Sequence, residues 1–598
     1  MNQGFGNGFA LGDFVQHSYH WRDVLSHVAG NHTLKFGYDG WHGDDLAYFA
    51  STHDQPAFQF NSLLDLVQDN PYSESGLAYN PLNGKAQPGN YGYAETTAGL
   101  FAEDTWKALL NLTINFGLRW DDFGNPYPYL AGTNLSNFYL GYGFTFDKQV
   151  ANGVMKKVNN VYVRPLWDAW APRAGFAWDP TKTGSWVIRG GAGMYHDEPT
   201  LGNDENGLNQ NPPGYIVPTF YSNGVTSPPI FAFGTSNKPP FGFPYPALNS
   251  TSLTPAGGLA NQQLNVGGIN PDLVSPTTIN YAVTLAHRLF SSVVGSVWYQ
   301  GSHTYNEMWG YGNTGNTAYG FDVNRFAGNL IQCACTTPTR LNPSFGAITY
   351  ATNGVRANYQ GVVLDLKGRF RDSFFEASYT HSRAYDDSQT YPTVDINQYY
   401  APSSFDVPNR FSLLWNYSFP DLKNGNGLLR HLLSGWSISG TSIVQSGNPY
   451  TVYTSAPFQP ILQNGAVVGL KPGSGDYNAD GFNLDYPNVS SYSTPTSRQA
   501  YLSGIFAAGN FPVPALGTEG NERVNQFWEP MFAETDAALL KDTKLYERLD
   551  LQLRFEAYNV FNRPNLQGVD SNLADGTFGR VTAQYNPRWL QVGARLLF

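Results

Sequence analysis

Apolar and polar residues alternate along many segments of this chain. In residues 549–558, LDLQLRFEAY, the odd-numbered positions are apolar and most of the even-numbered positions are polar. Successive side chains of a β-strand point to opposite faces, so this segment predicts a strand with one oily face and one polar face. The same pattern runs through 33–39, 111–121 and 409–419, and more weakly through 98–106, 172–179, 186–195, 278–286, 293–299, 361–370, 374–382 and 436–444.

Many of these segments have about ten residues, whereas a strand of a globular protein usually has about five or six. A tilted strand of about ten residues is long enough to cross a bilayer. Residues 196–277 and 450–533 are rich in Pro, Asn and Gly and predict long loops, whereas 370–373 predicts a tight turn. The sequence therefore predicts an all-β fold, a transmembrane antiparallel β-barrel with short periplasmic turns and long extracellular loops.

Aromatic residues near the predicted strand ends suit this interpretation, because Trp and Tyr gather at the two membrane–water interfaces. They include Trp41, Trp106, Trp120, Trp178, Trp186, Trp298 and Trp436. The alternative is a large soluble β-sandwich or propeller. Its strands would be shorter, and a propeller would show a repeat of about 40–50 residues, which this sequence lacks.

The composition narrows the class of protein further. Charged residues make up 14% of the 598 positions, against about 25% in an average soluble domain. The net charge of −11 offers no basic footprint, so no nucleic acid is expected as a partner. Cys333 and Cys335 are the only cysteines, which excludes a disulfide framework and leaves open a short bridge or two loop thiols. The start of the sequence resembles no signal peptide, so we expect it to begin inside a larger protein.

The end of the chain has a pattern of its own. The last nine residues, LQVGARLLF, form an alternating segment that closes on an aromatic side chain. This ending resembles the insertion signal of bacterial outer-membrane barrels. The resemblance implies that the barrel assembly machinery recognises Gln591, Gly593, Leu596 and Phe598.

Several segments, taken in order, resemble the barrel domain of TonB-dependent outer-membrane receptors, in particular the Oar-like branch. They are GNHTLKFG at 30–37, FAEDTW at 101–106, LTINFGLRW at 112–120, PRAGFAWD at 172–179, IRGGAGMY at 188–195, ASYTHSRA at 377–384, PNRF at 408–411, SGW at 434–436, QSGNPY at 445–450 and RFEAYNVFNRP at 554–564. The resemblance covers residues from about 30 to 598, and the order of the segments is more specific than any one of them.

The resemblance implies a division of the chain and a function. Residues 30–598 would form the outer-membrane barrel domain, and 1–29 would be the start of a fragment, either strand or loop. Signal peptide, plug and the first barrel strands would be absent. The function implied is energy-coupled uptake of an unidentified ligand across the bacterial outer membrane, driven by the TonB complex through the plug. Two alternatives remain: a passive porin or adhesion-type barrel, and a soluble carbohydrate-binding β protein.

In the barrel, one strand face would contact the plug and water, and the other would contact lipid. The predicted lumen residues are Arg119, Asp121, Asp550, Gln552, Arg554 and Glu556, and the predicted lipid-facing residues are Leu112, Phe116, Leu551 and Phe555.

One loop has the spacing of oxygen ligands that calcium prefers. Asp476, Asn478 and Asp480 alternate before a glycine, and Asp485 follows as a further ligand. An EF-hand carries Glu at the twelfth position, where this chain has Pro487. A structural Ca²⁺ site and a plain Asx-rich turn therefore both remain open, and no other cofactor is expected.

Other residues give weaker signals. His17 and His20 are three apart, a spacing that suits a metal on a helix but splays the two rings on a strand. The sequence contains no lipase-type serine elbow, no zinc-protease motif and no phosphate-binding loop. We therefore expect the protein not to be an enzyme.

Overall fold

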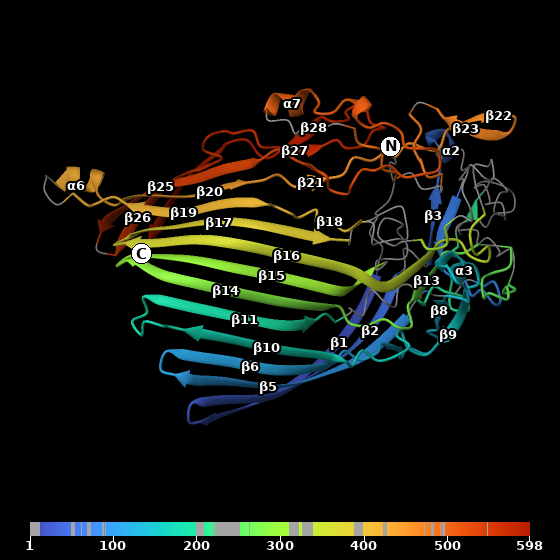
Figure 1. Ribbon diagram of the computed structural model, residues 1–598, viewed down its shortest axis with the longest axis horizontal. Helices are drawn as coiled ribbons and strands as arrows, with labels where there is room; N and C mark the ends of the chain where they lie inside the picture. Colours follow the sequence, from blue (N-terminus) through green and yellow to red (C-terminus); the bar gives the residue numbers. More distant parts are fainter. Residues whose placement is uncertain are drawn as a thin grey trace.

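The structure is a computed structural model of the chain (Figure 1). It describes residues 12–49, 54–60, 62–67, 73–85, 89, 91–198, 208–218, 220–221, 251–261, 263–309, 322–325, 339–387, 399–422, 427–471, 473–479, 484–490, 492, 497–546 and 548–598.

Most of the described chain belongs to one large sheet in which each long strand pairs antiparallel with the next. In spatial order the strands are β1 (Gly12–Ala29), β2 (His32–Phe49), β5 (Tyr91–Leu109), β6 (Leu112–Asp122), β10 (Ala169–Trp178), β11 (Trp186–His196), β14 (Thr277–Phe290), β15 (Val293–Trp309), β16 (Ile348–Phe370), β17 (Ser373–Asp386), β19 (Asn409–Ser418), β20 (Trp436–Gln445), β25 (Phe532–Tyr546), β26 (Leu549–Tyr558) and β29 (Trp589–Leu597). This arrangement confirms the predicted all-β class and antiparallel order.

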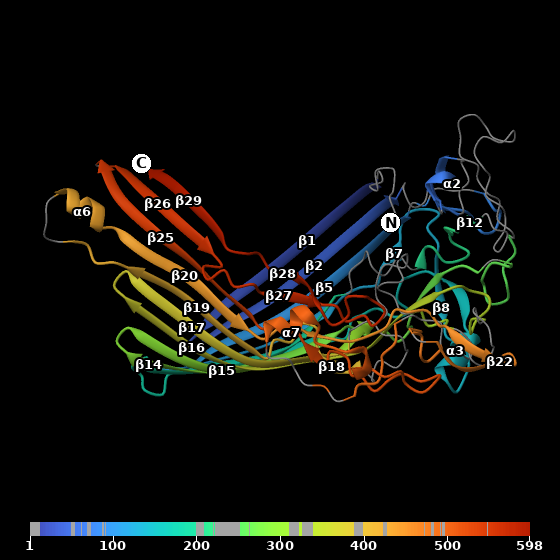
Figure 2. The ribbon, with the colours of Figure 1, turned by 90° about the horizontal axis from the view of Figure 1, so that it is seen from above.

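The sheet curves into a long trough, with β1 and β29 along its two margins (Figure 2). Among the described residues, no backbone ladder joins β1 to β29. Three short strands add to this sheet. β7 (Tyr127–Pro128) pairs with β5, β18 (Ala401–Pro402) pairs with β17, and β13 (Val266–Ile269) pairs parallel with the start of β16. None of the helices in the described part of the chain has the length and apolarity that crossing a bilayer would require.

The two ends of the trough differ as the sequence predicted. At one end the strands are joined by tight connections, such as residues 110–111 between β5 and β6 and 371–372 between β16 and β17. The other end carries long connections that fold into a layer of small elements (Figures 1 and 2). These are β3 (Asp54–Gln59), α2 (Leu63–Val67), β4 (Ser73–Leu77), β7 (Tyr127–Pro128), β8 (Leu135–Tyr139), α3 (Phe146–Ala151), β9 (Val154–Val158), β12 (Phe220–Tyr221), β18 (Ala401–Pro402), β21 (Pro449–Tyr450), β22 (Pro460–Gln463), β23 (Ala466–Leu470), α7 (Arg498–Ser503), η2 (Ala508–Asn510), β24 (Phe527–Trp528), β27 (Leu566–Val569) and β28 (Val581–Gln584).

The apolar cores of the described chain lie in this loop layer. Phe138 and Phe345 are remote in sequence, yet their rings meet edge to face with centroids 5.6 Å apart, and both side chains are fully buried. A second core, here called the aromatic cap, contains Tyr450, Phe506 and Phe527. Long loops with buried cores of their own form a structured layer over the open end of the trough.

The region 1–29 was predicted as strand or loop, and its described part is the long strand β1. One strand was not expected. The predicted loop 450–533 contains the start of β25, which the alternation pattern did not reveal. Cys333 and Cys335 lie outside the described residues.

Candidate functional site

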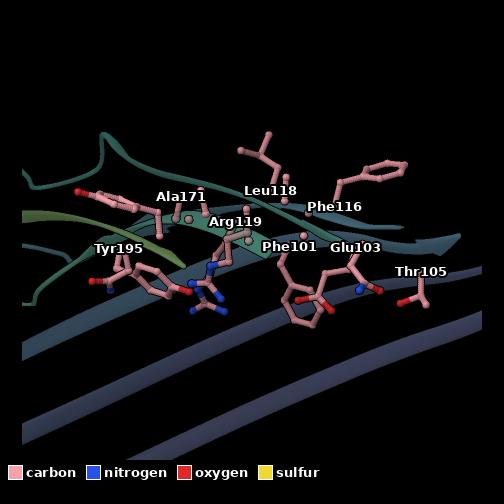
Figure 3. Close-up of a pocket in the computed structure, with 18 of the residues that line it drawn as sticks. Phe101, Glu103, Thr105, Phe116, Leu118, Arg119, Ala171 and Tyr195 are labelled. Carbon is pink, nitrogen blue, oxygen red and sulfur yellow. The ribbon is translucent and has the colours of Figure 1, made fainter. Parts of the chain in front are cut away.

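The two faces of the strands differ in chemistry. On β6, Phe116 and Leu118 project to one side, whereas Arg119 projects to the other (Figure 3). Phe101 and Glu103 of β5 share the side of Arg119, because Arg119 pairs with Phe101 and Gly117 with Glu103 in the ladder. Phe116 is 49% exposed. Along most of β6 the apolar residues therefore form the outer face of the wall, and the polar ones form the inner face.

The inner face is hollowed by a groove of about 1030 Å³ that crosses strands from β1 to β16. Small residues form much of its floor, including Gly117, Gly175, Gly191 and Gly301. Polar side chains that can donate or accept hydrogen bonds surround this floor, including Asn115, Asn280, Gln300 and Ser302. A wide cavity with a few polar groups is typical of a surface that receives a ligand or another protein segment.

Four cationic side chains line one half of this groove: Arg22, Lys35, Arg119 and Arg173. Arg119 is neutralised by Asp121, with Nη2 at 2.6 Å from Oδ1 and Nε at 2.8 Å from Oδ2. Gly99 on β5 makes room for this pair, because a Cβ there would lie 2.5 Å from both the Arg119 and the Asp121 side-chain atoms. The predicted lumen residues Arg119 and Asp121 therefore meet on the inner face.

The other cations of the groove are held less tightly. Arg22 has Nε 3.8 Å from a carboxylate oxygen of Asp39. The guanidinium of Arg173 lies over the ring of Tyr195, 4.5 Å from its centroid. In the described part of the chain, neither Lys35 nor Arg173 has an acidic partner within salt-bridge distance. Glu103 lies opposite Lys35 in the β2–β5 ladder without forming an ion pair, so both cations can contact an anionic group that enters the groove.

A second hollow of about 630 Å³ lies on the same inner face, closer to the loop layer. Carboxylates dominate it, since Asp39, Glu95, Asp121 and Glu198 all line it together with His20. The inner face thus changes from acidic near the loops to basic deeper in the trough. Such a gradient orients charged groups that pass along the wall.

Two described histidines near the N-terminus lie close to carboxylates. His17 lies 2.8 Å from Asp44, and His20 lies 3.3 Å from Asp39, with the two histidines on opposite faces of β1. The predicted splaying of these rings on a strand is therefore confirmed. Among the described residues, no group of three or more His, Cys, Asp or Glu side chains has a metal-holding arrangement.

The predicted lumen residues of β26 form short-range contacts. Arg554 Nη2 lies 3.5 Å from Glu556 Oε1, and Gln552 Nε2 donates to Asp542 Oδ1 at 2.9 Å. Leu551 and Phe555 alternate with these residues and occupy the outer face. Asp550 lies opposite Leu597 in the ladder, at the tight-turn end.

The predicted insertion signal lies on the margin of the sheet. β29 pairs with β26 through Gln591 to Glu556, Gly593 to Arg554 and Leu596 to Leu551. Gln591 and Gly593 share the inner face, while Leu596 belongs to the outer face, with 54% of its surface exposed. Phe598 follows the strand and is fully exposed. A marginal strand presents unpaired backbone groups, which is the geometry that another strand can extend.

The predicted calcium loop lies in the loop layer, with Asp480 outside the described residues. Asp476 and Asp485 are buried, with 1% and 0% of their surface exposed. Asn478 Nδ2 donates to Glu519 Oε1 at 2.7 Å, and Tyr486 N donates to Glu519 Oε2 at 3.0 Å. Glu519 thus adds a carboxylate that the sequence pattern did not include. The described carboxylates of this loop do not form a group of three metal ligands, and calcium binding stays a prediction.

An acidic side chain is buried in the aromatic cap. Glu522 Oε1 accepts a hydrogen bond from Val452 N at 2.5 Å, whereas Oε2 is buried without a hydrogen-bond partner among the described residues. Burial raises the pKa of Glu522 from 4.5 to about 9, and the Val452 hydrogen bond opposes this only in part. Glu522 is therefore protonated in the folded cap at neutral pH.

Replacement of Glu522 by Gln should make the cap less sensitive to alkaline pH. The folded state holds a proton that the unfolded chain loses above about pH 4.5, so the stabilisation from protonated Glu522 is complete below that value. It is lost progressively as the pH rises toward about 9, at roughly 1.4 kcal/mol per pH unit as an upper bound. The variant should match the wild type near pH 4.5 and exceed it near pH 9.

Thermal midpoints from near-ultraviolet circular dichroism, measured in detergent across this pH range, check the expectation. Glu376→Gln, in β17 at the tight-turn end and outside the cap, is the control. Equal slopes of stability against pH for E522Q and the wild type would contradict it.

Lys35, Arg22 and Arg173 were not among the residues predicted for the site. Lys35 and Arg173 occupy polar positions of alternating segments, so the sequence pattern could have predicted that they face inward. The pattern could not predict that they line one groove, because the groove joins strands that lie far apart in the chain.

Comparison with known proteins agrees with this architecture. A family model described as an outer membrane beta barrel domain matches residues 1–591. No curated protein matches the sequence. Among solved structures, the chain is similar to the outer membrane transporter YddB from Escherichia coli, with 11% identity and a TM-score of 0.50 over 98% of this chain and 55% of that one.

It is also similar to the siderophore receptor PirA from Acinetobacter baumannii, with 11% identity, a TM-score of 0.44, and coverage of 98% of this chain and 55% of that one. The chain thus spans about half the length of these solved proteins. At this identity the likeness to YddB shows the fold alone. The family match covers nearly the whole sequence, and the chain belongs to the outer membrane beta barrel domain family.

Proposed function

We propose that the chain is the barrel part of a TonB-dependent receptor that takes up a scarce, unidentified ligand. The family places the chain in the outer membrane, so the predicted location is confirmed. In the proposed cycle the loop layer and a plug segment bind the ligand outside. The TonB complex then displaces the plug by force transmitted across the periplasm, and the ligand passes along the inner wall.

The observation that carries the proposal is the groove on the inner face. A passive pore needs an open, hydrated lumen, whereas a receptor needs a wall that holds a removable partner. The groove combines a floor of small residues with Lys35 and Arg173, two cations without an acidic partner among the described residues. A plug that presents carboxylates there would bind through charge-assisted hydrogen bonds, which can be broken and remade.

The passive porin or adhesion-type barrel remains the alternative within the same family. It shares the membrane-spanning wall but needs neither a plug nor TonB. The soluble carbohydrate-binding protein, the third hypothesis from the sequence, conflicts with the shown outer-membrane family.

Uptake in the native host distinguishes receptor from porin. Three strains are compared: the wild type, a strain without this gene, and a strain without TonB. Each is given radiolabelled ferric siderophores, oligosaccharides and peptides at nanomolar concentration. The receptor predicts that at least one compound loses uptake in both deletion strains. Loss of uptake in the gene deletion with normal uptake in the TonB deletion would overturn the proposal in favour of a porin.

Calcium binding by the loop that contains Asp476 should stabilise the loop layer. Removal of Ca²⁺ with EGTA is expected to lower the thermal midpoint of the purified protein, and added Ca²⁺ at 100 times its Kd should restore about 2.7 kcal/mol. Asp476→Asn should abolish the response, while the control Asp570→Asn, in a turn elsewhere in the layer, should retain it. An identical midpoint with EGTA and with Ca²⁺ would favour the plain Asx-rich turn.

A further inference from the structure

One connection at the tight-turn end differs from the others there. Residues 419–435 join β19 to β20 and contain the helix α6 (Gly427–Leu433). α6 projects beyond the strand ends at the end opposite the loop layer (Figures 1 and 2). Its neighbours at this end are tight turns, so the helix is an addition that closing the hairpin does not require.

The helix is amphipathic, and its apolar face is uncovered. Successive helical residues are about 100° apart, so its four leucines occupy one face and Arg430 and His431 occupy the other. The leucines, which are Leu428, Leu429, Leu432 and Leu433, are 70%, 44%, 56% and 55% exposed. An exposed apolar patch of this kind marks a surface that contacts a partner or a membrane.

The base of α6 is fixed on the outer face of the wall. Trp436 Nε1 donates to Leu432 O at 2.8 Å, and Lys541 Nζ donates to Ser434 O at the end of the helix. Trp436 and Lys541 are direct partners in the β20–β25 ladder. They share the outer face with Leu539 and Phe555, because Leu539 is two residues from Lys541 and pairs with Phe555. The helix therefore leaves the wall on the lipid side.

Lys541 gives a physical reason for the position of α6 on the outer face. A lysine on the lipid-facing side of a strand is costly unless its charge has partners. Lys541 is only 6% exposed, and its ammonium group is 5.8 Å from the centroid of the Trp436 ring. The carbonyl group of Ser434 completes its coordination, and a helix C-terminus is a favourable place for a cation.

Gly435, between α6 and β20, lies close against β25. Gly435 has φ +75°, and a Cβ there would lie 2.2 Å from the carbonyl oxygen of Asp542 on β25. Gly435 N donates to Asp421 Oδ1 at 2.9 Å, and Leu422 N donates to Ser434 Oγ at 2.9 Å. The orientation of α6 is therefore set by the wall.

We propose that α6 is an interfacial anchor that inserts its leucine face into the periplasmic leaflet of the outer membrane. The continuity of the surface supports lipid as the occupant. Tyr417 and Phe419 are 47% and 44% exposed on the outer face next to Trp436, and aromatic residues of this kind mark the membrane–water interface. The leucines extend this lipid-facing surface sideways, and Arg430 on the opposite face can reach lipid phosphates.

Single-cysteine probes test the insertion. In a Cys333→Ser, Cys335→Ser background, cysteine replaces Leu429, Leu432, Arg430 or, as a control in the β16–β17 turn, Asp372. Each protein is labelled with an environment-sensitive fluorophore and reconstituted in vesicles of phosphatidylethanolamine and phosphatidylglycerol that carry doxyl quenchers on their acyl chains. Quenching should be at least about twofold stronger at 429 and 432 than at 430 and 372, and independent of the protein-to-lipid ratio.

Equal quenching at the four positions, or quenching at 429 and 432 that appears only at high protein density, would overturn the proposal. A probe at Phe116 reports insertion of the wall itself, so failure of α6 to insert is distinguishable from failure of the barrel to insert. The inference rests on the outer-membrane location and is independent of TonB. Lys541→Met should lower the quenching at 432 while leaving that at 116 unchanged, and Lys541→Arg should preserve both.

Discussion

Replacement of Phe598 by Ala should reduce the amount of folded protein in the outer membrane by about tenfold or more. Burial of a Phe side chain stabilises a complex by about 1.5–3 kcal/mol, and about 1.4 kcal/mol corresponds to a factor of ten in occupancy. Phe598 is fully exposed at the end of β29, so the isolated fold loses little when the ring is removed. The decrease in folded protein should therefore result from weaker recognition by the assembly machinery.

The matched variants separate recognition from folding. Phe598→Tyr keeps an aromatic ring and should retain most of the wild-type level. Leu597→Ala removes a side chain that is 39% exposed from the neighbouring inner-face position and should have a small effect. Folded protein is measured by heat-modifiable gel mobility in outer-membrane fractions. An F598A level equal to that of the wild type would show that the terminal ring is not part of an insertion signal.

Charge reversal of the two available groove cations, Lys35→Glu with Arg173→Glu, should reduce uptake of the transported compound by about tenfold or more. A hydrogen bond to a charged group contributes about 1.5–3 kcal/mol, so loss of two such bonds to an anionic plug or ligand exceeds a factor of ten. Arg119 is unsuitable for this test because it is already paired with Asp121, and its reversal would break that pair.

Arg189→Glu is the control for this prediction. Arg189 is an inner-facing cation of β11 that does not line the groove. Uptake of the compound identified in the native host is measured at equal levels of folded protein. The neutral pair Lys35→Gln, Arg173→Gln should have a smaller effect than the charge reversal. Equal uptake by the wild type and the charge-reversed variant would show that the groove is not part of the transport path.

The strands that the sequence revealed are those whose outer face is uniformly apolar. β6 and β26 expose only apolar residues on that face through most of their length, and their alternation is visible without a structure. β1 was not recognised as a strand with certainty because His17, Asp23 and His27 occupy its outer face. β25 was not predicted because Lys541 interrupts its apolar positions. In the structure, the ammonium group of Lys541 donates to the carbonyl oxygen of Ser434, at the end of a helix from another hairpin.

The site and the loop layer depend on contacts that a local pattern does not contain. Arg119 and Asp121 were predicted for the lumen face from the alternation of one strand, and the structure shows in addition that they form an ion pair. The groove brings together residues from Arg22 to Tyr359, and its shape depends on the register of the intervening strands. The pairing of Glu519 with Asn478 joins two parts of the loop layer and has no signature in either segment.

The central claim is that adjacent residues of one strand face opposite environments, one facing lipid and the next facing an aqueous lumen. Spin labels at Phe116 and Asn115 of β6 test it, because successive residues of a strand face opposite sides and Phe116 lies on the side opposite Arg119. In phospholipid vesicles, the label at 116 should collide with dissolved oxygen and be shielded from a water-soluble nickel complex, and the label at 115 should show the reverse. Equal accessibility of both labels to the nickel complex would contradict the account.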